Sequence, residues 1–266
     1  MIYRSLWAGL ALFGCVVAAE ETPPAPTPAA NLATKAEEPW AEHRLVGYEP
    51  VYFAFGAHEL ANVKFQLSFR YLVTQRINVA YSQTSIWNLE SQSKPFYDTS
   101  YKPRAFWRED RIPRPAWMQD FAIEAGAGHE SNGQSEPKTR SMNMAFVRPD
   151  LHFQLSDPWR VRLYPMVIHY LEKSENDDLQ VYRGYFDLFA GVQRTDWGGL
   201  SILGRVGSGW DKGSIETQYT YPLGQWLGGG EAPYLFLQWF NGYGESLLDY
   251  NQRTPWQVRL GFAIVR

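Results

Sequence analysis

The stretch VKFQLSFRY, residues 63–71, decides the fold because its side chains alternate in polarity along the chain. The odd positions are apolar or aromatic, and the even positions are Lys, Gln, Ser and Arg. Successive side chains of a strand point to opposite faces, so this period of two predicts a strand with one apolar and one polar face. Residues 256–264 repeat the pattern near the C-terminus, with Arg259 on the polar face.

Similar segments fill the chain between these two ends, separated by turn residues such as the Ser-Asp-Pro at 156–158. The predicted strands are 48–55, 62–73, 76–89, 101–109, 115–130, 141–155, 159–171, 181–195, 200–209, 213–222, 233–243 and 254–265. An even count of about twelve short strands is typical of bacterial single-chain membrane barrels.

The N-terminus has the pattern of a cleaved signal peptide over residues 1–19. Arg4 precedes an apolar run over residues 6–17, and small residues stand before the expected cleavage after Ala19. Cys15 lies inside this segment and loosely suggests a lipoprotein site, but the apolar run continues beyond it, which favours ordinary cleavage. Residues 20–47, rich in Pro, Ala, Thr and Glu, are expected to form a disordered periplasmic leader.

Composition also favours a membrane barrel for residues 48–266. Aromatic residues make up 16% of the chain, with 11 Trp, against 20% charged residues, and Trp and Tyr collect in girdles at the two lipid–water interfaces of a barrel. After residue 19 no apolar run approaches the roughly 18 residues of a spanning helix, so only a closed barrel would satisfy its backbone groups in lipid. A net charge of −3 makes nucleic acid an unexpected partner.

A soluble β-sandwich is the alternative fold, since its strands also alternate. The export signal and the many aromatic residues favour instead an all-β transmembrane antiparallel β-barrel of about twelve strands. Its hydrated lumen would be lined by the polar set on the faces opposite the apolar ones. This set is Lys64, Arg70, Asp120, Glu124, Arg160, Arg162 and Arg259.

The segment GHESNG, residues 128–133, ends one predicted strand with residues that could carry chemistry. The apolar face of this strand is formed by the odd positions Phe121, Ile123, Ala125 and Ala127. Continued alternation places His129 and Ser131 on that lipid-facing side as neighbours. A serine nucleophile needs a base within reach and a third group that orients the base, and Asn143 on the next strand has the matching parity. A His-x-Ser pair alone is a weak signal, because it occurs often by chance.

Three longer blocks make the signal specific: HESNGQSEPKTRSMN at 129–143, YSQTSIW at 81–87 followed by PF at 95–96 and YKP at 101–103, and GYGESLLDYN at 242–251. From about Tyr48 to the C-terminus the chain resembles the bacterial outer membrane phospholipase A family. The first block is similar to the active-site segment of that family.

The resemblance implies a calcium-dependent enzyme in the outer membrane of a Gram-negative bacterium, active as a homodimer on membrane phospholipid. It would hydrolyse acyl ester bonds of phospholipids, at the sn-1 and sn-2 positions, and of lysophospholipids. By match to the motif, Ser131 would be the nucleophile, His129 the general base and then acid, Asn143 the orienting residue, and Gln83 a support for Asn143.

Calcium prefers oxygen ligands, and the resemblance implies three of them. These are the backbone carbonyl of Gln134, the hydroxyl of Thr139 and the backbone carbonyl of Ser93 of the partner subunit. The family commonly has Arg at position 134 and Ser at position 139, so this chain keeps a carbonyl at the first and a hydroxyl at the second.

The alternative function is a non-enzymatic barrel, either a channel or a structural protein with an idle Ser131. A channel would not need His129, Ser131 and Asn143 together on the lipid side, and this grouping favours the enzyme. The acidic run 172–178 could bind calcium, but it is more simply a solvated loop.

Overall fold

The computed structural model describes residues 44–265 except residues 59, 91, 94 and 226–231. The expected signal peptide, residues 1–19, and the leader up to residue 43 lie outside the described part. No helix among the described residues is long and apolar enough to cross a membrane.

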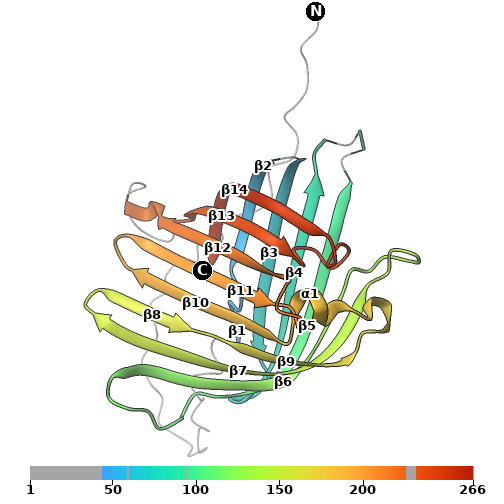
Figure 1. Cartoon of the computed structure of the whole chain (residues 1–266). Helices are drawn as coiled ribbons and strands as arrows, with labels where there is room; N and C mark the ends of the chain where they lie inside the picture. Colours follow the sequence, from blue (N-terminus) through green and yellow to red (C-terminus); the bar gives the residue numbers. More distant parts are fainter. Residues whose placement is uncertain (1–43, 59, 91, 94, 226–231, 266) are drawn as a thin grey trace, which may run out of the picture. The chain divides into compact units, whose positions relative to one another are not determined.

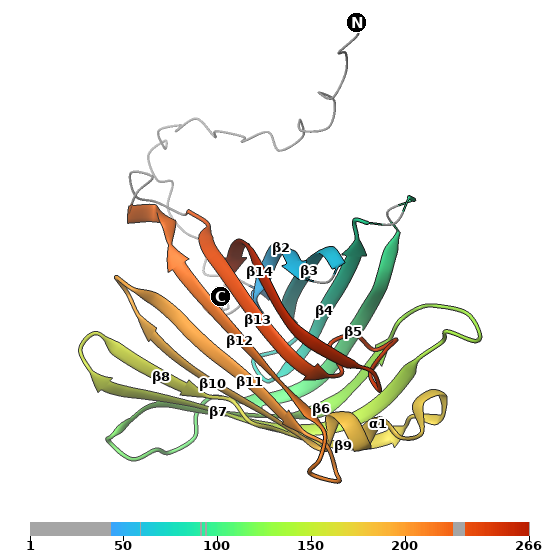
Figure 2. The same ribbon diagram turned by 45° about the horizontal axis from the view of Figure 1, so that its top comes forward.

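The described residues form a closed antiparallel β-barrel (Figures 1 and 2). Each strand from β2 to β8, and each from β9 to β14, pairs with its neighbour in the chain, and β14 returns to pair with β2, so the sheet has no open edge. The strands are β2 (Val51–His58), β3 (Leu60–Leu72), β4 (Ile77–Asn88), β5 (Phe96–Glu109), β6 (Met118–Ser131), β7 (Ser141–Ser156), β8 (Trp159–Leu163), β9 (Met166–Glu172), β10 (Phe186–Arg194), β11 (Gly198–Val206), β12 (Gly213–Pro222), β13 (Tyr234–Tyr243) and β14 (Arg253–Val265).

β8 and β9 occupy one position in the barrel, between β7 and β10. The interruption falls at Tyr164 and Pro165, and proline has no N–H to donate to a neighbouring strand. Counting this pair once, the described part of the chain has twelve strand positions around the barrel. The predicted fold class is therefore confirmed, and the closure between β14 and β2 excludes the sandwich.

The barrel exposes apolar side chains and buries polar ones. On β14, Arg259 is 1% exposed, whereas its neighbour Leu260 is 54% exposed. On β2, Phe53 and Phe55 are exposed on either side of the buried Ala54. This arrangement reverses that of a soluble sheet and suits a barrel whose outer face meets lipid.

Ion pairs line the lumen. It contains one cavity of about 550 Å³ and a second of about 600 Å³, the second at the end of the barrel opposite the last residue of β6. Glu124 accepts hydrogen bonds from Arg148 at 2.6 Å and from Arg108 at 2.7 Å, and Lys64 pairs with Glu216 at 3.0 Å. Such pairing offsets the large cost of taking charges out of water. The predicted lumen residues lie on the inner face. The first cavity is lined by Lys64, Arg70, Glu124 and Arg162, and the second by Asp120, Arg160 and Arg162. Arg259 is buried.

Two predicted strand boundaries near the N-terminus are wrong. The strand expected over 48–55 starts only at Val51, because Tyr48 and Glu49 turn into the lumen, where Arg104 donates to Glu49 at 2.9 Å and Arg148 donates to the Tyr48 hydroxyl. The expected leader 20–47 also ends too late. The short strand β1 (Leu45–Val46) within it pairs with β3.

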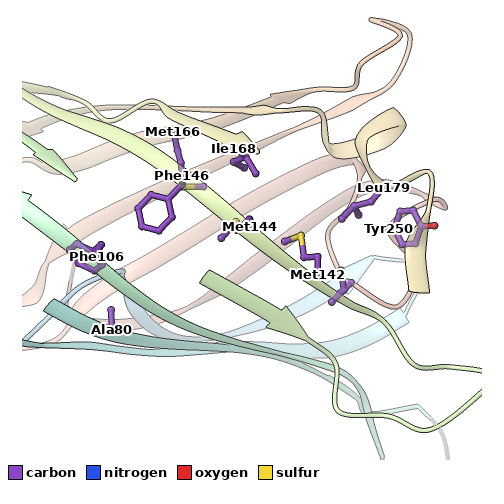
Figure 3. Packing of buried hydrophobic residues seen from close by; sticks show 10 residues of the cluster. Ala80, Phe106, Met142, Met144, Phe146, Met166, Ile168, Leu179 and Tyr250 are labelled. Atoms are coloured by element: carbon purple, nitrogen blue, oxygen red, sulfur yellow. The ribbon is translucent and has the colours of Figure 1, made fainter. Parts of the chain in front are cut away.

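Part of the strand predicted over 181–195 is instead the helix α1 (Leu179–Arg183), which follows the short 3-10 helix η2 (Ser174–Asn176). Leu179 is fully buried in a cluster with Met142 and Tyr250, as Figure 3 shows. Burial of this apolar side chain outweighs the local preference of the segment for extended structure. The acidic run 172–178, expected as a solvated loop, is therefore part of a folded segment. A third short helix, η3 (Leu223–Gln225), follows β12.

The strand expected over 101–109 starts earlier, at Phe96, where it pairs with Trp87 of β4. Asp98 in this extension is buried and accepts the backbone N–H groups of Leu247 and Leu248, each at 3.0 Å. The loop at 242–251 therefore packs against the start of β5.

Candidate active site

The site lies where β6 ends and β7 begins, the end of the barrel that also carries α1 (Figure 2). In the β6–β7 ladder His129 is directly opposite Asn143, and Ser131 is directly opposite Ser141. The even-numbered side chains here, such as Glu130 and Met142, are buried. Because strand side chains alternate, His129, Ser131 and Asn143 project together from the outer face.

The imidazole of His129 is held by Asn143. The Nδ1 atom of His129 lies 2.8 Å from the Oδ1 atom of Asn143. An amide oxygen only accepts hydrogen bonds, so Nδ1 must be the donor and carries the proton. In the neutral ring this leaves a lone pair on Nε2, the nitrogen free to act as a base.

Ser131 follows His129 by two residues on the same face. Within the described part of the chain its hydroxyl forms no hydrogen bond, so no protein group competes for it. Contacts between a nucleophile and its base are commonly long without substrate and shorten in the reacting complex. The position of the hydroxyl is therefore compatible with activation by His129.

The loop after Ser131 is organised by the buried side chain of Asn132. Its amide Nδ2 donates to the Lys138 carbonyl at 2.8 Å, and its Oδ1 accepts the N–H groups of Gln134 and Arg140 at 3.3 and 3.0 Å. The residue is only 3% exposed. Asn132 thus closes residues 132–140 into one compact turn. No role was predicted for Asn132 from the sequence, although Asn before Gly is a common turn signal.

Gly133 is required by this turn for two reasons. Its φ of +64° is in the left-handed region that side-chain-bearing residues rarely adopt. A Cβ atom there would also lie 2.9 Å from the Tyr101 ring. Tyr101 is the β5 residue opposite Ser131, so the turn packs down beside the serine.

The turn also presents oxygen atoms of the kind calcium prefers. The Thr139 hydroxyl donates its proton to Glu175 Oε2 at 3.1 Å. A hydroxyl that donates to a carboxylate keeps its oxygen lone pairs available for a cation. Gln134 lies in the same turn and has a backbone carbonyl, so two of the three expected donors are oxygen atoms of one turn, the donor type that suits calcium. No group of three or more His, Cys, Asp or Glu side chains with metal-binding geometry occurs among the described residues.

The other two expected residues are not brought to this site within one chain. Ser93 is exposed in the turn between β4 and β5, a different hairpin from the one that carries Gln134 and Thr139. Gln83 of β4 accepts from the Tyr81 hydroxyl at 2.9 Å and donates to Ser85 at 3.2 Å. Because β5 and β6 separate β4 from β7, Gln83 does not contact Asn143 of the same chain. The prediction that Gln83 supports Asn143 within one chain is therefore wrong.

A carboxylate that was expected in a solvated loop lies in the strand next to Asn143. Glu172, the last residue of β9, is opposite Asn143 on the side away from His129. Its carboxylate accepts the N–H of Ser174 at 2.6 Å. His129, Asn143 and Glu172 therefore form one row across three neighbouring strands.

Comparison with known proteins agrees with this fold. The family model described as phospholipase A1 matches residues 36–265. The phospholipase A1 of Escherichia coli (strain K12) is 31% identical over 212 residues, which are 76% of this chain and 68% of that protein.

Solved structures of outer membrane phospholipases have a similar fold. An Escherichia coli outer membrane phospholipase A, solved as an active-site mutant with an asparagine replaced by alanine, has a TM-score of 0.71 and 26% identity, covering 87% of this chain and 94% of that one. A Salmonella typhi outer membrane phospholipase dimer with bound calcium has a TM-score of 0.71 and 26% identity, covering 85% and 94%. The chain therefore belongs to the phospholipase A1 family, and it is an outer-membrane β-barrel phospholipase, a carboxylic ester hydrolase.

Proposed function

We propose that the chain is a calcium-dependent phospholipase that cleaves acyl esters of phospholipids and lysophospholipids with Ser131, His129 and Asn143. The observation that carries this proposal is the 2.8 Å contact between His129 Nδ1 and Asn143 Oδ1. It leaves Nε2 as the base beside a serine on the lipid-facing side of the barrel. The asparagine-to-alanine variant of the Escherichia coli enzyme, described as an active-site mutant, supports a role for an asparagine.

The reaction follows from these positions. The Ser131 oxygen attacks the ester carbonyl carbon as His129 Nε2 takes the hydroxyl proton. His129 then gives that proton to the departing glycerol oxygen, and water later cleaves the acyl–serine ester by the same route in reverse order. Asn143 holds the ring in the required tautomer throughout. Because the residues project from the outer face, the ester of a bilayer lipid reaches them directly.

Calcium would be held by the Gln134 carbonyl, the Thr139 hydroxyl and the carbonyl of Ser93 of the partner subunit. When bound, the ion supplies positive charge close to the oxygen that becomes negative during attack. The calcium-bound Salmonella typhi dimer supports both the ion and a homodimer for this chain. The exposure of Ser93 on a separate hairpin leaves it accessible to a second copy.

The test is Ser131→Ala in the refolded full-length protein with calcium. Hydrolysis of phospholipid in mixed micelles should fall to background, while heat-modifiable migration of the folded barrel is kept. Ser141→Ala is the matched control, because Ser141 is the directly paired serine on the same face, and it should retain most of the activity.

Activity persisting in Ser131→Ala would overturn the serine mechanism. Excess EDTA tests the ion separately, since full activity in its presence would remove calcium and leave the serine in place. If the unaltered protein instead lacks hydrolysis in calcium and conducts ions in planar bilayers, the passive channel is correct.

A further inference from the structure

Glu130 stands between the two residues to which we assign the chemistry. His129 and Ser131 project outward, so Glu130 projects into the lumen, where it is 4% exposed. It is also the last residue but one of β6 and pairs with Met142. The ladder to β7 ends one residue later, at Ser131, and strand ends open more readily than strand centres. A contact that fixes the Glu130 side chain therefore also restrains the end of β6, where His129 and Ser131 lie.

Arg183, the final residue of α1, holds Glu130. Its Nη1 atom lies 3.2 Å from Glu130 Oε2, and both side chains are almost fully buried. In the described part of the chain Arg183 is the cation that reaches within 4.0 Å of this carboxylate. Without this partner the buried carboxylate would keep only the more distant charges of Lys102, Arg205 and Arg104, and removing one member of a buried pair is costly.

The position of Arg183 is itself determined by its surroundings. Gly244 leaves room for it, since a Cβ there would lie 2.8 Å from Arg183 Cγ. Gly184 ends α1 with a φ of +67°, and its carbonyl accepts from the Tyr170 hydroxyl at 2.9 Å. These contacts direct the guanidinium toward Glu130.

The rest of α1 is anchored to the loop after β13. Leu179 is buried beside Tyr250 (Figure 3), and the Tyr250 hydroxyl donates to Asp178. Burial and the adjoining Asp178 carboxylate raise the pKa of Tyr250, so its hydroxyl stays protonated and remains a donor. The helix is thus a fixed support for Arg183.

The same segment contacts the partner strand of the site. Asn176 of η2 is buried, and its Oδ1 accepts the N–H of Ser141, the first residue of β7, at 3.1 Å. The segment 174–183 therefore fixes the end of β6 through Glu130 and the start of β7 through Ser141.

We propose that Arg183 is a positioning residue that holds the end of β6 from the lumen side through Glu130, and so sets the approach of Ser131 to His129. This inference rests on the proposed roles of those two residues. The pair touches neither substrate nor the reacting atoms. Its loss should therefore lower kcat while leaving KM, which reports lipid binding on the outer face, nearly unchanged.

The test compares Arg183→Met, Glu130→Gln and the double variant, each as the refolded full-length protein with calcium. Each single variant should lower kcat about tenfold or more, since small misplacements of reacting groups cost up to about a hundredfold. The double variant should lose much less than the product of the two single losses, because neither member of the pair is left as a charge without its counterion. Arg183→Lys should recover part of the activity.

Two further readouts separate positioning from general stability. Hydrogen exchange should increase at residues 130–132 in the single variants, and labelling of Ser131 by a sulfonyl fluoride should slow in proportion to kcat. Glu216→Gln is the matched control, because it breaks another buried lumen pair, with Lys64, away from β6, and it leaves the contact of Lys64 with Glu245 in the 242–251 loop in place. It should lower the unfolding midpoint and leave kcat unchanged.

Unchanged kcat in folded Arg183→Met, or losses that multiply in the double variant, would overturn the positioning role. An equal loss of kcat in Glu216→Gln would show that the pair of Arg183 and Glu130 acts only on stability. Failure of the proposed function is distinguishable, since it would appear as activity and labelling that persist in Ser131→Ala.

Discussion

Asn143 presents its amide oxygen to His129 Nδ1 at 2.8 Å from the directly paired position on the neighbouring strand. The contact needs no loop or mobile segment, because the register of two barrel strands sets it. An antiparallel pair brings directly opposite side chains within about 5 Å at Cβ, which is the spacing an imidazole and an amide can bridge. A site built on strands is held more rigidly than one built on loops.

This contact predicts different losses for its two members. His129→Ala removes the base, and we expect the hydrolysis rate to fall by about 10²–10⁴-fold. Asn143→Ala keeps the base but frees the ring, so the rate should fall less, by about 10–100-fold. Initial rates on mixed micelles at saturating calcium measure both, with heat-modifiable migration as the check on folding. A greater loss in Asn143→Ala than in His129→Ala would contradict an orienting role.

The proposed calcium site predicts different outcomes for two substitutions in the same turn. Thr139→Val removes a proposed ligand oxygen and should raise the calcium concentration for half-maximal activity about tenfold or more, which corresponds to about 1.4 kcal/mol or more of binding free energy. Gln134→Ala keeps the backbone carbonyl and should change that concentration little. Activity titrated against buffered free calcium distinguishes them. Equal shifts in both variants would argue against ligation through the Gln134 backbone.

The turn at Gly133 should not tolerate a side chain. Gly133→Ala places a Cβ at a φ of +64° and 2.9 Å from the Tyr101 ring, and the left-handed backbone alone costs about 1–2 kcal/mol. We expect faster hydrogen exchange in residues 132–140 and a higher calcium requirement. Gly204→Ala is the control, because its Cβ would meet its nearest atom, the Leu188 carbonyl oxygen, at 4.0 Å. Similar behaviour of the two variants would show that the turn is adaptable.

The lumen network should contribute more to stability than ion pairs at the surface. Arg148→Met leaves Glu124 with less compensation in a buried site, and breaking such a pair costs about 3–5 kcal/mol. The denaturant midpoint of the refolded barrel should fall accordingly. Arg194→Met breaks the exposed pair with Asp196 and should leave the midpoint unchanged. Equal midpoints for the two variants would mean that lumen water compensates for the lost partner.

Local pattern alone predicts most of the barrel. The period of two seen in residues 63–71 is a property of neighbouring residues, so it predicts strand positions and which face each side chain takes. The outward placement of His129 and Ser131 follows from it without knowledge of any distant contact. The family resemblance then supplied the roles and the calcium donors, which alternation cannot supply.

The exceptions all depend on residues far apart in the chain. Tyr48 and Glu49 leave the strand pattern because Arg104 and Arg148 attract them into the lumen. α1 is helical because Leu179 is buried under the loop at 242–251. Glu130 is 53 residues from Arg183 in sequence, so its alternation predicts a lumen position but not its partner. Burial and charge pairing across the closed barrel are tertiary effects, and they determined where the end of β6 is held.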